Sequence, residues 1–101
     1  MLKDDEWCFA CGQANPHGLR LHDFEYDGDS YSVSFTPRKH HQGWSGIVHG
    51  GIMATLLDEV MTRMLWEDGV NAATAELTVR YHYPTPVGET LTATAHKRTQ
   101  R

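Results

Sequence analysis

Two adjacent glycines at the expected start of a helix, followed by an acid, have the clearest potential for chemistry in this chain. They form the run His49-Gly50-Gly51, and Asp58 comes seven residues after the second glycine. Glycines leave the backbone bare, and the first N–H groups of a helix lack partners within it and lie at the positive end of its dipole. Such groups suit a developing negative charge, and a carboxylate supplies a nucleophile or a base. The pattern therefore predicts attack on an ester-like carbonyl.

The spacing of these groups indicates how such a site would be assembled. Gly51 and Asp58 are seven positions apart, which corresponds to about 10 Å along a helix axis. One helix cannot easily place both groups around the same carbonyl. Either an acid from elsewhere in the chain completes the site, or a second copy of the helix does. The second arrangement is a symmetric dimer with two sites at its interface.

A second group of reactive side chains lies near the N-terminus. Cys8 and Cys11 form a Cys-x-x-Cys pair, and His17 and His22 follow. Thiolates and imidazoles in this order are able to form a small zinc knuckle. The alternative is a turn that carries two reduced thiols, the usual state of cysteine in the cytoplasm. The residues leave both alternatives open.

Length and composition restrict the class of protein. The chain has 101 residues and a formal net charge of -4, which predicts one small domain over residues 1–101 and argues against nucleic acid as a partner. Its apolar stretches are too short to span a bilayer. The N-terminus is acidic where a signal peptide would be basic and then apolar, so we expect a cytoplasmic protein.

One long helix is predicted to carry the glycine pair and the acid. Apolar residues recur at helical spacing from Gly50 to Glu67, and Gly69 is a plausible stop. Within this helix Glu59 lies four residues before Arg63, a spacing that favours a surface ion pair.

Strands are predicted on both sides of the helix. Residues 1–18 are rich in Cys, Gly and Pro and are expected to form a loop, whereas 19–26 is strand-like and leads through a turn into an alternating segment at 31–35. After the helix, 73–83 alternates as a long strand with one buried face, and a further strand starts at 91. The order predicts an α+β fold with one helix packed on an antiparallel sheet.

These motifs resemble those of a known family. The run His49-Gly50-Gly51 with Leu57-Asp58 resembles the signature of hotdog-fold acyl-CoA thioesterases of the phenylacetyl-CoA thioesterase-like (PaaI-like) group. The wider segments 42–51 and 77–89 agree with it, and Cys8-Phe9-Ala10-Cys11-Gly12 resembles one branch of the group. The resemblance covers nearly the whole chain and implies a hotdog fold, in which an antiparallel sheet wraps one long central helix.

The resemblance also implies roles for individual residues. Asp58 stands at the position of the catalytic carboxylate, and Gly51 at that of the glycine whose N–H meets the thioester oxygen. Thr74 matches the Ser or Thr that helps to hold the attacking water, and His49 fixes the loop by hydrogen bonding. Some relatives carry Asn six residues before the motif histidine, where this chain has glycine. The substrate-binding candidates are His49, Gly50 and Gln42.

The implied activity is hydrolysis of an acyl-CoA, or another acyl thioester, to a carboxylic acid and a free thiol. No cofactor is expected, and the partners implied are the acyl-CoA substrate and further copies of the chain, as a homodimer or a homotetramer, with no nucleic acid and no membrane. Whether Asp58 is a nucleophile or a general base stays open. Several basic residues either meet the coenzyme A phosphates or form solvated surface: Arg38, Lys39, Lys97, Arg98 and Arg101.

Two functions other than thioester hydrolysis are also compatible with the sequence. The chain could be a non-catalytic hotdog module that binds acyl-CoA or only dimerises. It could also be a metal-binding interaction domain built on Cys8 and Cys11. Relatives continue with further sheet strands beyond this length, so the chain is either a fragment or a sheet with exposed edges, which invite pairing with another chain.

Overall fold

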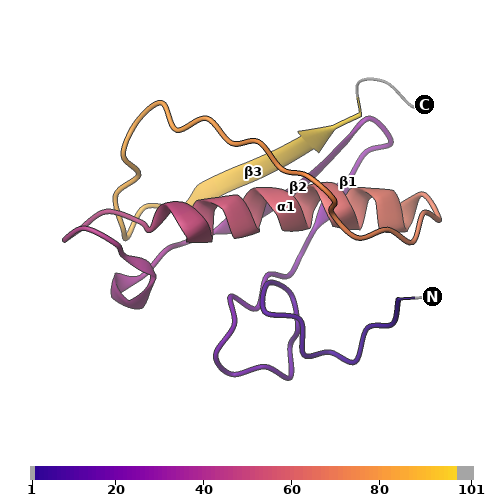
Figure 1. Cartoon of the computed structure of the whole chain (residues 1–101), viewed down its shortest axis with the longest axis horizontal. Coiled ribbons are helices and arrows are strands. Elements are labelled where there is room, and N and C mark those ends of the chain that lie inside the picture. Colours follow the sequence, from indigo (N-terminus) through magenta and orange to yellow (C-terminus); the bar gives the residue numbers. More distant parts are fainter. Residues whose placement is uncertain (1, 98–101) are drawn as a thin grey trace.

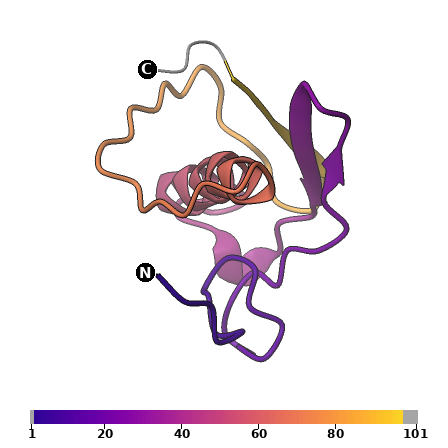
Figure 2. The ribbon, with the colours of Figure 1, turned by 90° about the vertical axis from the view of Figure 1, so that its right-hand side faces the viewer.

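The computed structural model describes residues 2–97 as one helix packed against a small antiparallel sheet (Figures 1 and 2). The helix α1 spans Gly50–Glu67, and the strands are β1 (Glu25–Tyr26), β2 (Ser30–Phe35) and β3 (Leu91–His96). The strands lie in the order β1-β2-β3, and each neighbouring pair is antiparallel. A short 3-10 helix at Lys39–His41 precedes α1. The α+β prediction is therefore confirmed.

The predicted bounds of α1 are also confirmed, because local residues define both ends. His49 is the N-cap residue, with extended backbone, and its side chain accepts a hydrogen bond from the helix. At the other end Gly69 has a φ of +83°, which glycine adopts without steric cost. The N–H of Val70 then reaches back to the carbonyl of Leu65 at 2.8 Å and closes the last turn.

The core lies between α1 and the sheet. Alternate residues of β2 and β3 point to the helix, because successive strand side chains face opposite sides of a sheet. Tyr31 pairs with Ala95 and Val33 with Ala93. These four residues pack with one stripe of the helix, which consists of Leu56, Val60 and Met64. Burial of each large apolar side chain stabilises the fold by about 1.5–3 kcal/mol.

The strand-like segment before the first turn forms less strand than predicted. Only Glu25–Tyr26 pairs with β2. Leu19 and Leu21 instead receive their backbone partners from the N-terminal loop, with N–H groups 2.8 and 2.9 Å from the carbonyls of Phe9 and Ala10. Asp23, between these residues and β1, has a φ of +58°, which interrupts an extended strand.

The prediction of a long strand at 73–83 is wrong in this structure. The segment has no strand pairing and lies along α1, crossing in front of it in Figure 1. A strand is held by hydrogen bonds to a neighbouring strand, and within residues 2–97 the sheet consists of β1, β2 and β3 alone, so this segment has no strand partner. Most apolar side chains of the segment stay exposed, including Leu77, Tyr81 and Tyr83, the last by 84%. Alternation of apolar and polar residues shows which face a strand could bury. It does not show whether a second strand lies beside it to form the hydrogen bonds.

Candidate active site

The glycine pair lies where the sequence predicts, at the first turn of α1. The N–H of Gly51 is engaged, since it donates to Nδ1 of His49 at 2.8 Å. The carbonyl of Gly50 accepts a hydrogen bond of 2.7 Å from the hydroxyl of Tyr81. Among residues 2–97 the N–H of Gly50 has no hydrogen-bond partner. The backbone donor that the structure presents is therefore that of Gly50, and His49 covers the neighbouring donor.

The loop before the helix is held by its own hydrogen bonds. The N–H of Gly46 donates to Oε1 of Gln42 at 3.1 Å, and the N–H of Gly43 to the carbonyl of Ile47 at 2.9 Å. The side-chain oxygen of Gln42 is thus used within the loop, which leaves its NH₂ group for a ligand. A Cβ at Gly43 would lie 3.3 Å from Cδ2 of His49. A side chain at that position would press on the imidazole.

His41 anchors the 3-10 turn at Lys39–His41, which precedes this loop in the chain. Its ring is buried, and Nδ1 accepts the N–H of Arg38 at 2.9 Å. Its carbonyl accepts the N–H of His49 at 2.8 Å. Burial, together with the positive charges of His40 and Arg38, lowers the pKa of His41 below its ordinary value. The neutral imidazole is the form that accepts the Arg38 N–H, so the loop depends on that form.

A hollow of about 400 Å³ opens beside the glycine pair. It is lined by Gly43, Trp44, Val48, His49 and Gly50. The indole of Trp44 is 85% exposed and forms a free apolar wall. Gly50, whose N–H has no partner within residues 2–97, thus lines the hollow beside apolar surface, a combination suited to a carbonyl joined to an apolar group.

The acid and the threonine that the sequence singled out meet in the structure. Thr74 donates its hydroxyl to Oδ1 of Asp58 in a hydrogen bond. A second hydroxyl, that of Thr62, lies 3.5 Å from Oγ1 of Thr74. Asp58 is half-buried on α1 and Thr74 is exposed on the segment that crosses the helix. The carboxylate therefore faces a small cluster of hydroxyl groups, which is suited to holding a water.

The two halves of the predicted site are not brought together within one chain. Gly51 and Asp58 both belong to α1, so about 10 Å of helix separates them along its axis. Tyr81, which holds the first turn of α1 through Gly50, was not expected. Its sequence signals were a place in an alternating segment and in the family-like run 77–89, and neither gives its position relative to the helix.

The basic residues considered for contact with coenzyme A phosphates lie in several different parts of the chain. Arg38 and Lys39 are exposed next to the 3-10 turn. Lys97 forms an ion pair with Asp68, which also accepts the hydroxyl of Tyr26 at 2.6 Å. Arg98 and Arg101 lie outside the described residues.

The four residues considered for a zinc knuckle near the N-terminus, Cys8, Cys11, His17 and His22, are not brought together. His17 and His22 are exposed, and His22 pairs with the carbonyl of Arg20 at 2.9 Å. Cys8 instead donates to Oε1 of Glu59 with a distance of 3.9 Å. Burial, followed by the neighbouring Glu59 and Cys8, raises the pKa of Cys11 to about 12.

The predicted surface pair of Glu59 with Arg63 is also wrong. Glu59 is only 9% exposed and turns toward the cysteines. Arg63 donates to the hydroxyl of Tyr31 at 3.3 Å and to Sγ of Cys11 at 3.6 Å. The N-terminal loop attracts Glu59, and β2 together with that loop attracts Arg63. Helical spacing alone shows neither of these neighbours.

Comparison with known proteins decides the family. The sequence model of the Thioesterase superfamily matches residues 45–98, which include the glycine pair, Asp58 and Thr74. The chain belongs to the thioesterase superfamily. Cys8 and Cys11 lie outside the matched region.

Two relatives extend this result. Acyl-coenzyme A thioesterase 13 of Mus musculus is 34% identical over 58 residues, which are 55% of this chain and 41% of that protein. The crystal structure of RHA08564, a thioesterase superfamily protein, is similar with a TM-score of 0.70 and 37% identity, over 77% of this chain and 40% of that one. The chain thus spans about 40% of the length of these relatives. The hotdog fold is confirmed by the match and by the helix on its antiparallel sheet.

No helix within the described residues combines the length and the apolar character needed to cross a bilayer.

Proposed function

We propose that this thioesterase-superfamily chain hydrolyses an acyl-CoA, or another acyl thioester, to a carboxylic acid and a free thiol. The observation that carries the proposal is the hydrogen bond between Thr74 and Asp58, on the helix whose first turn bears the glycine pair. The name of the mouse relative, an acyl-coenzyme A thioesterase, supports coenzyme A as the thiol. No cofactor is part of the proposed reaction.

The carbonyl oxygen of the thioester would be bound at the first turn of α1. Gly50 offers an N–H there that has no partner within residues 2–97, and Gly51 offers a second once His49 releases it. Donors aimed at an oxygen that gains negative charge lower the barrier, typically by about 3–4 kcal/mol for one donor. His49 thus acts as a positioning residue that decides how many donors the substrate meets.

Asp58 would supply the attacking group. Its carboxylate either attacks the carbonyl carbon and forms an anhydride, or takes a proton from a water that attacks. The hydroxyl of Thr74 donates a hydrogen bond to Asp58, and in this position it would orient that water. In both routes the carbon–sulfur bond breaks, the thiol leaves with a proton, and the oxygen of water ends in the acid.

Because the glycine pair and Asp58 lie about 10 Å apart on one helix, a second copy would complete each site. We propose a homodimer, or a dimer of dimers, in which Asp58 of one copy faces the first turn of α1 in the other. The apolar hollow beside Trp44 would receive the acyl-thioester end of the substrate. The proposed location is the cytoplasm, with neither nucleic acid nor membrane as a partner.

A binding module without turnover is the second candidate, and the engaged N–H of Gly51 favours it. Asp58→Asn separates the two functions, because asparagine keeps the shape and still accepts the Thr74 hydroxyl but lacks the charge. For an enzyme, turnover of a panel of acyl-CoAs should fall on the order of a hundredfold or more. Binding and melting temperature should stay close to wild type.

Glu67→Gln is the matched control, since Glu67 is exposed at the far end of the same helix. It should leave turnover unchanged. Equal turnover in wild type and Asp58→Asn would contradict the proposed mechanism, and binding without turnover in the wild type would establish the module instead.

A further inference from the structure

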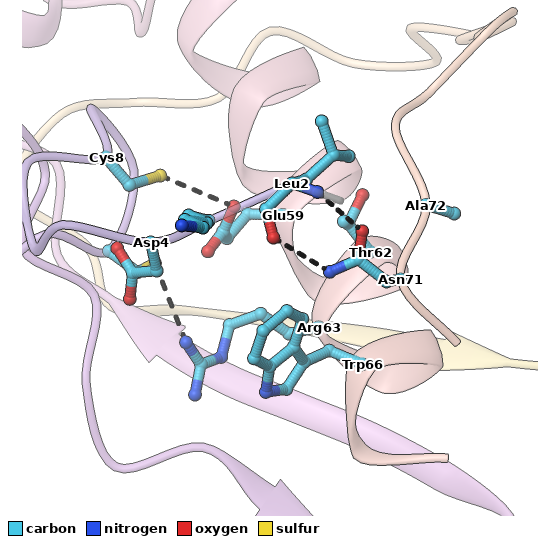
Figure 3. Close-up of a pocket in the computed structure, with 11 residues that line it drawn as sticks. Leu2, Asp4, Cys8, Glu59, Thr62, Arg63, Trp66, Asn71 and Ala72 are labelled. Atoms are coloured by element: carbon cyan, nitrogen blue, oxygen red, sulfur yellow. Dashed lines mark hydrogen bonds between the residues drawn. The ribbon is translucent and has the colours of Figure 1, made fainter. Parts of the chain in front are cut away.

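We propose that Cys8, Cys11 and Glu59 bind a zinc ion that fastens the N-terminal loop to α1. The two sulfur atoms and one carboxylate oxygen all lie within 4.8 Å of one another. Figure 3 shows the thiol of Cys8 directed at Glu59, with Arg63 beside them. This site is separate from the proposed thioester hydrolysis, and two of its three ligands, Cys8 and Cys11, lie outside the matched family region, whereas Glu59 lies within it.

The loop that carries the cysteines has the form of a tight knuckle. The N–H of Gly12 donates to the carbonyl of Cys8 at 2.8 Å, so the chain turns back directly after Cys11. A Cβ at Gly12 would lie 2.4 Å from the backbone nitrogen of Cys8 and 2.5 Å from the carbonyl oxygen of Glu6. Only glycine fits in this turn, and the turn directs both thiols to one side.

Glu59 supplies a buried negative charge without a cation. It is 9% exposed, and burial of an unpaired carboxylate is costly. Within residues 2–97 the ion pairs involve other acids, and none joins Glu59 to a basic side chain. Arg63, the nearest candidate on the helix, donates to Tyr31 and Cys11 instead. A divalent cation between the two thiols and Glu59 would compensate this charge.

The donor set favours zinc. Thiolates select zinc over calcium and magnesium, which take oxygen ligands. Zinc–sulfur and zinc–oxygen bonds of about 2.3 and 2.1 Å place ligand atoms about 3.5–3.8 Å apart. The three atoms would have to close by about 1 Å at most from their present separation, which rotation of the side chains provides.

The remaining coordination position faces a hollow. Its volume is about 470 Å³, and its wall includes Asp4, Cys8, Cys11, Glu59 and Arg63. A water in this hollow would complete four-coordinate zinc. The guanidinium of Arg63, 3.6 Å from Sγ of Cys11, would then donate to a metal-bound sulfur, the kind of outer contact that orients ligands. Since Glu59 follows Asp58 directly, the ion would also fix the middle of α1.

The test measures metal binding and needs no turnover. The full chain, reduced and stripped with a chelator, is titrated with Zn²⁺ against a chromophoric competitor. We expect one Zn²⁺ per chain, and an affinity that falls about tenfold to a hundredfold or more in Cys11→Ser and Glu59→Gln. The matched control is the double variant His17→Ala, His22→Ala, which should bind Zn²⁺ as the wild type does.

Two further readouts guard against variants that only unfold. Circular dichroism should show the same helix content in Glu59→Gln, in which glutamine still accepts from Cys8. With Co²⁺ in place of Zn²⁺, the wild type should show thiolate charge-transfer absorption, and Cys8→Ser should lose part of it. Zn²⁺ should also raise the melting temperature of the wild type and not that of Glu59→Gln.

Three results would overturn the proposal. The first is no saturable binding of Zn²⁺ by the reduced chain. The second is binding that survives in Glu59→Gln and disappears in the histidine double variant. The third is a Cys8–Cys11 disulfide that forms when the reduced chain is exposed to air, equally in the absence and in the presence of Zn²⁺.

Discussion

At the scale of single residues, Gly50 and Gly51 differ in the hydrogen bonding of their N–H groups, although both are glycines and adjacent in the chain. Gly51 donates its N–H to His49, whereas Gly50 keeps its own free within the described chain. The imidazole that caps the helix therefore competes with a substrate oxygen for one donor. The glycine pair could be predicted from its spacing in the sequence. Which of its two N–H groups is free depends on the ring orientation of His49, which the spacing does not fix.

Gly51→Val should impair turnover and substrate binding together. A Cβ at Gly51 would lie 3.1 Å from Nδ1 of His49, so valine would move the imidazole and fill the approach to both N–H groups. Loss of one such donor lowers kcat by about a hundredfold or more. Steady-state kinetics and a melting curve measure the effect. Unchanged kinetics in a folded variant would show that the glycines serve packing alone.

His41 should make the stability of the fold depend on pH. Its pKa is lowered in the folded state from the ordinary 6.5, so below that value the unfolded state takes up more protons. The free energy of unfolding should therefore fall as the pH drops from about 6.5 toward the folded-state pKa of His41, and level off below it. Urea unfolding at a series of pH values measures this slope.

His41→Asn is the comparison for that slope, since an amide oxygen accepts the Arg38 N–H without titrating. The difference in stability between wild type and variant should shrink or change sign as the pH falls. A difference that stays constant with pH would remove His41 as the cause.

At the scale of elements, the helix and two strands were predictable and one strand was not. Helical spacing and the flanking glycines define Gly50–Glu67, and alternation defines β2 and β3, because each of these signals is local. The segment 73–83 alternates equally well, yet it lies along α1. Strand formation depends on a neighbour that the local pattern does not contain. Glu59 was missed for a similar reason, since its partners come from the N-terminal loop.

Tyr81→Phe tests the course of this segment. The variant removes the hydroxyl that donates to the Gly50 carbonyl at 2.7 Å and keeps the ring. Because Tyr81 is 57% exposed, the loss should be modest, about 0.5–1 kcal/mol in the free energy of unfolding. Tyr83→Phe is the control, as its side chain is 84% exposed, and should be neutral. Equal stability of both variants would place Tyr81 away from the helix.

At the scale of the whole molecule, the chain has surfaces that a second copy could cover. β3 forms one edge of the described sheet and pairs only with β2. The face of α1 that carries Asp58 also carries Gly51, Ala54, Thr55 and Thr62, small residues that permit close approach of another helix. The same surfaces lie near both halves of the proposed site. The proposed shared sites would account for the separation of Gly51 from Asp58 along this face, whose residues other than Gly51 are half-buried in the single chain.

The most direct test of this account is subunit mixing between two inactive variants. Asp58→Ala and Gly51→Val are each purified, shown by light scattering to form dimers or larger assemblies, and allowed to exchange subunits. A mixed dimer with shared sites holds one site with both defects and one with neither. Thioester hydrolysis should then return to about a quarter of the wild-type rate for random pairing. If each site is built within one chain, every site keeps a defect and mixing restores no activity.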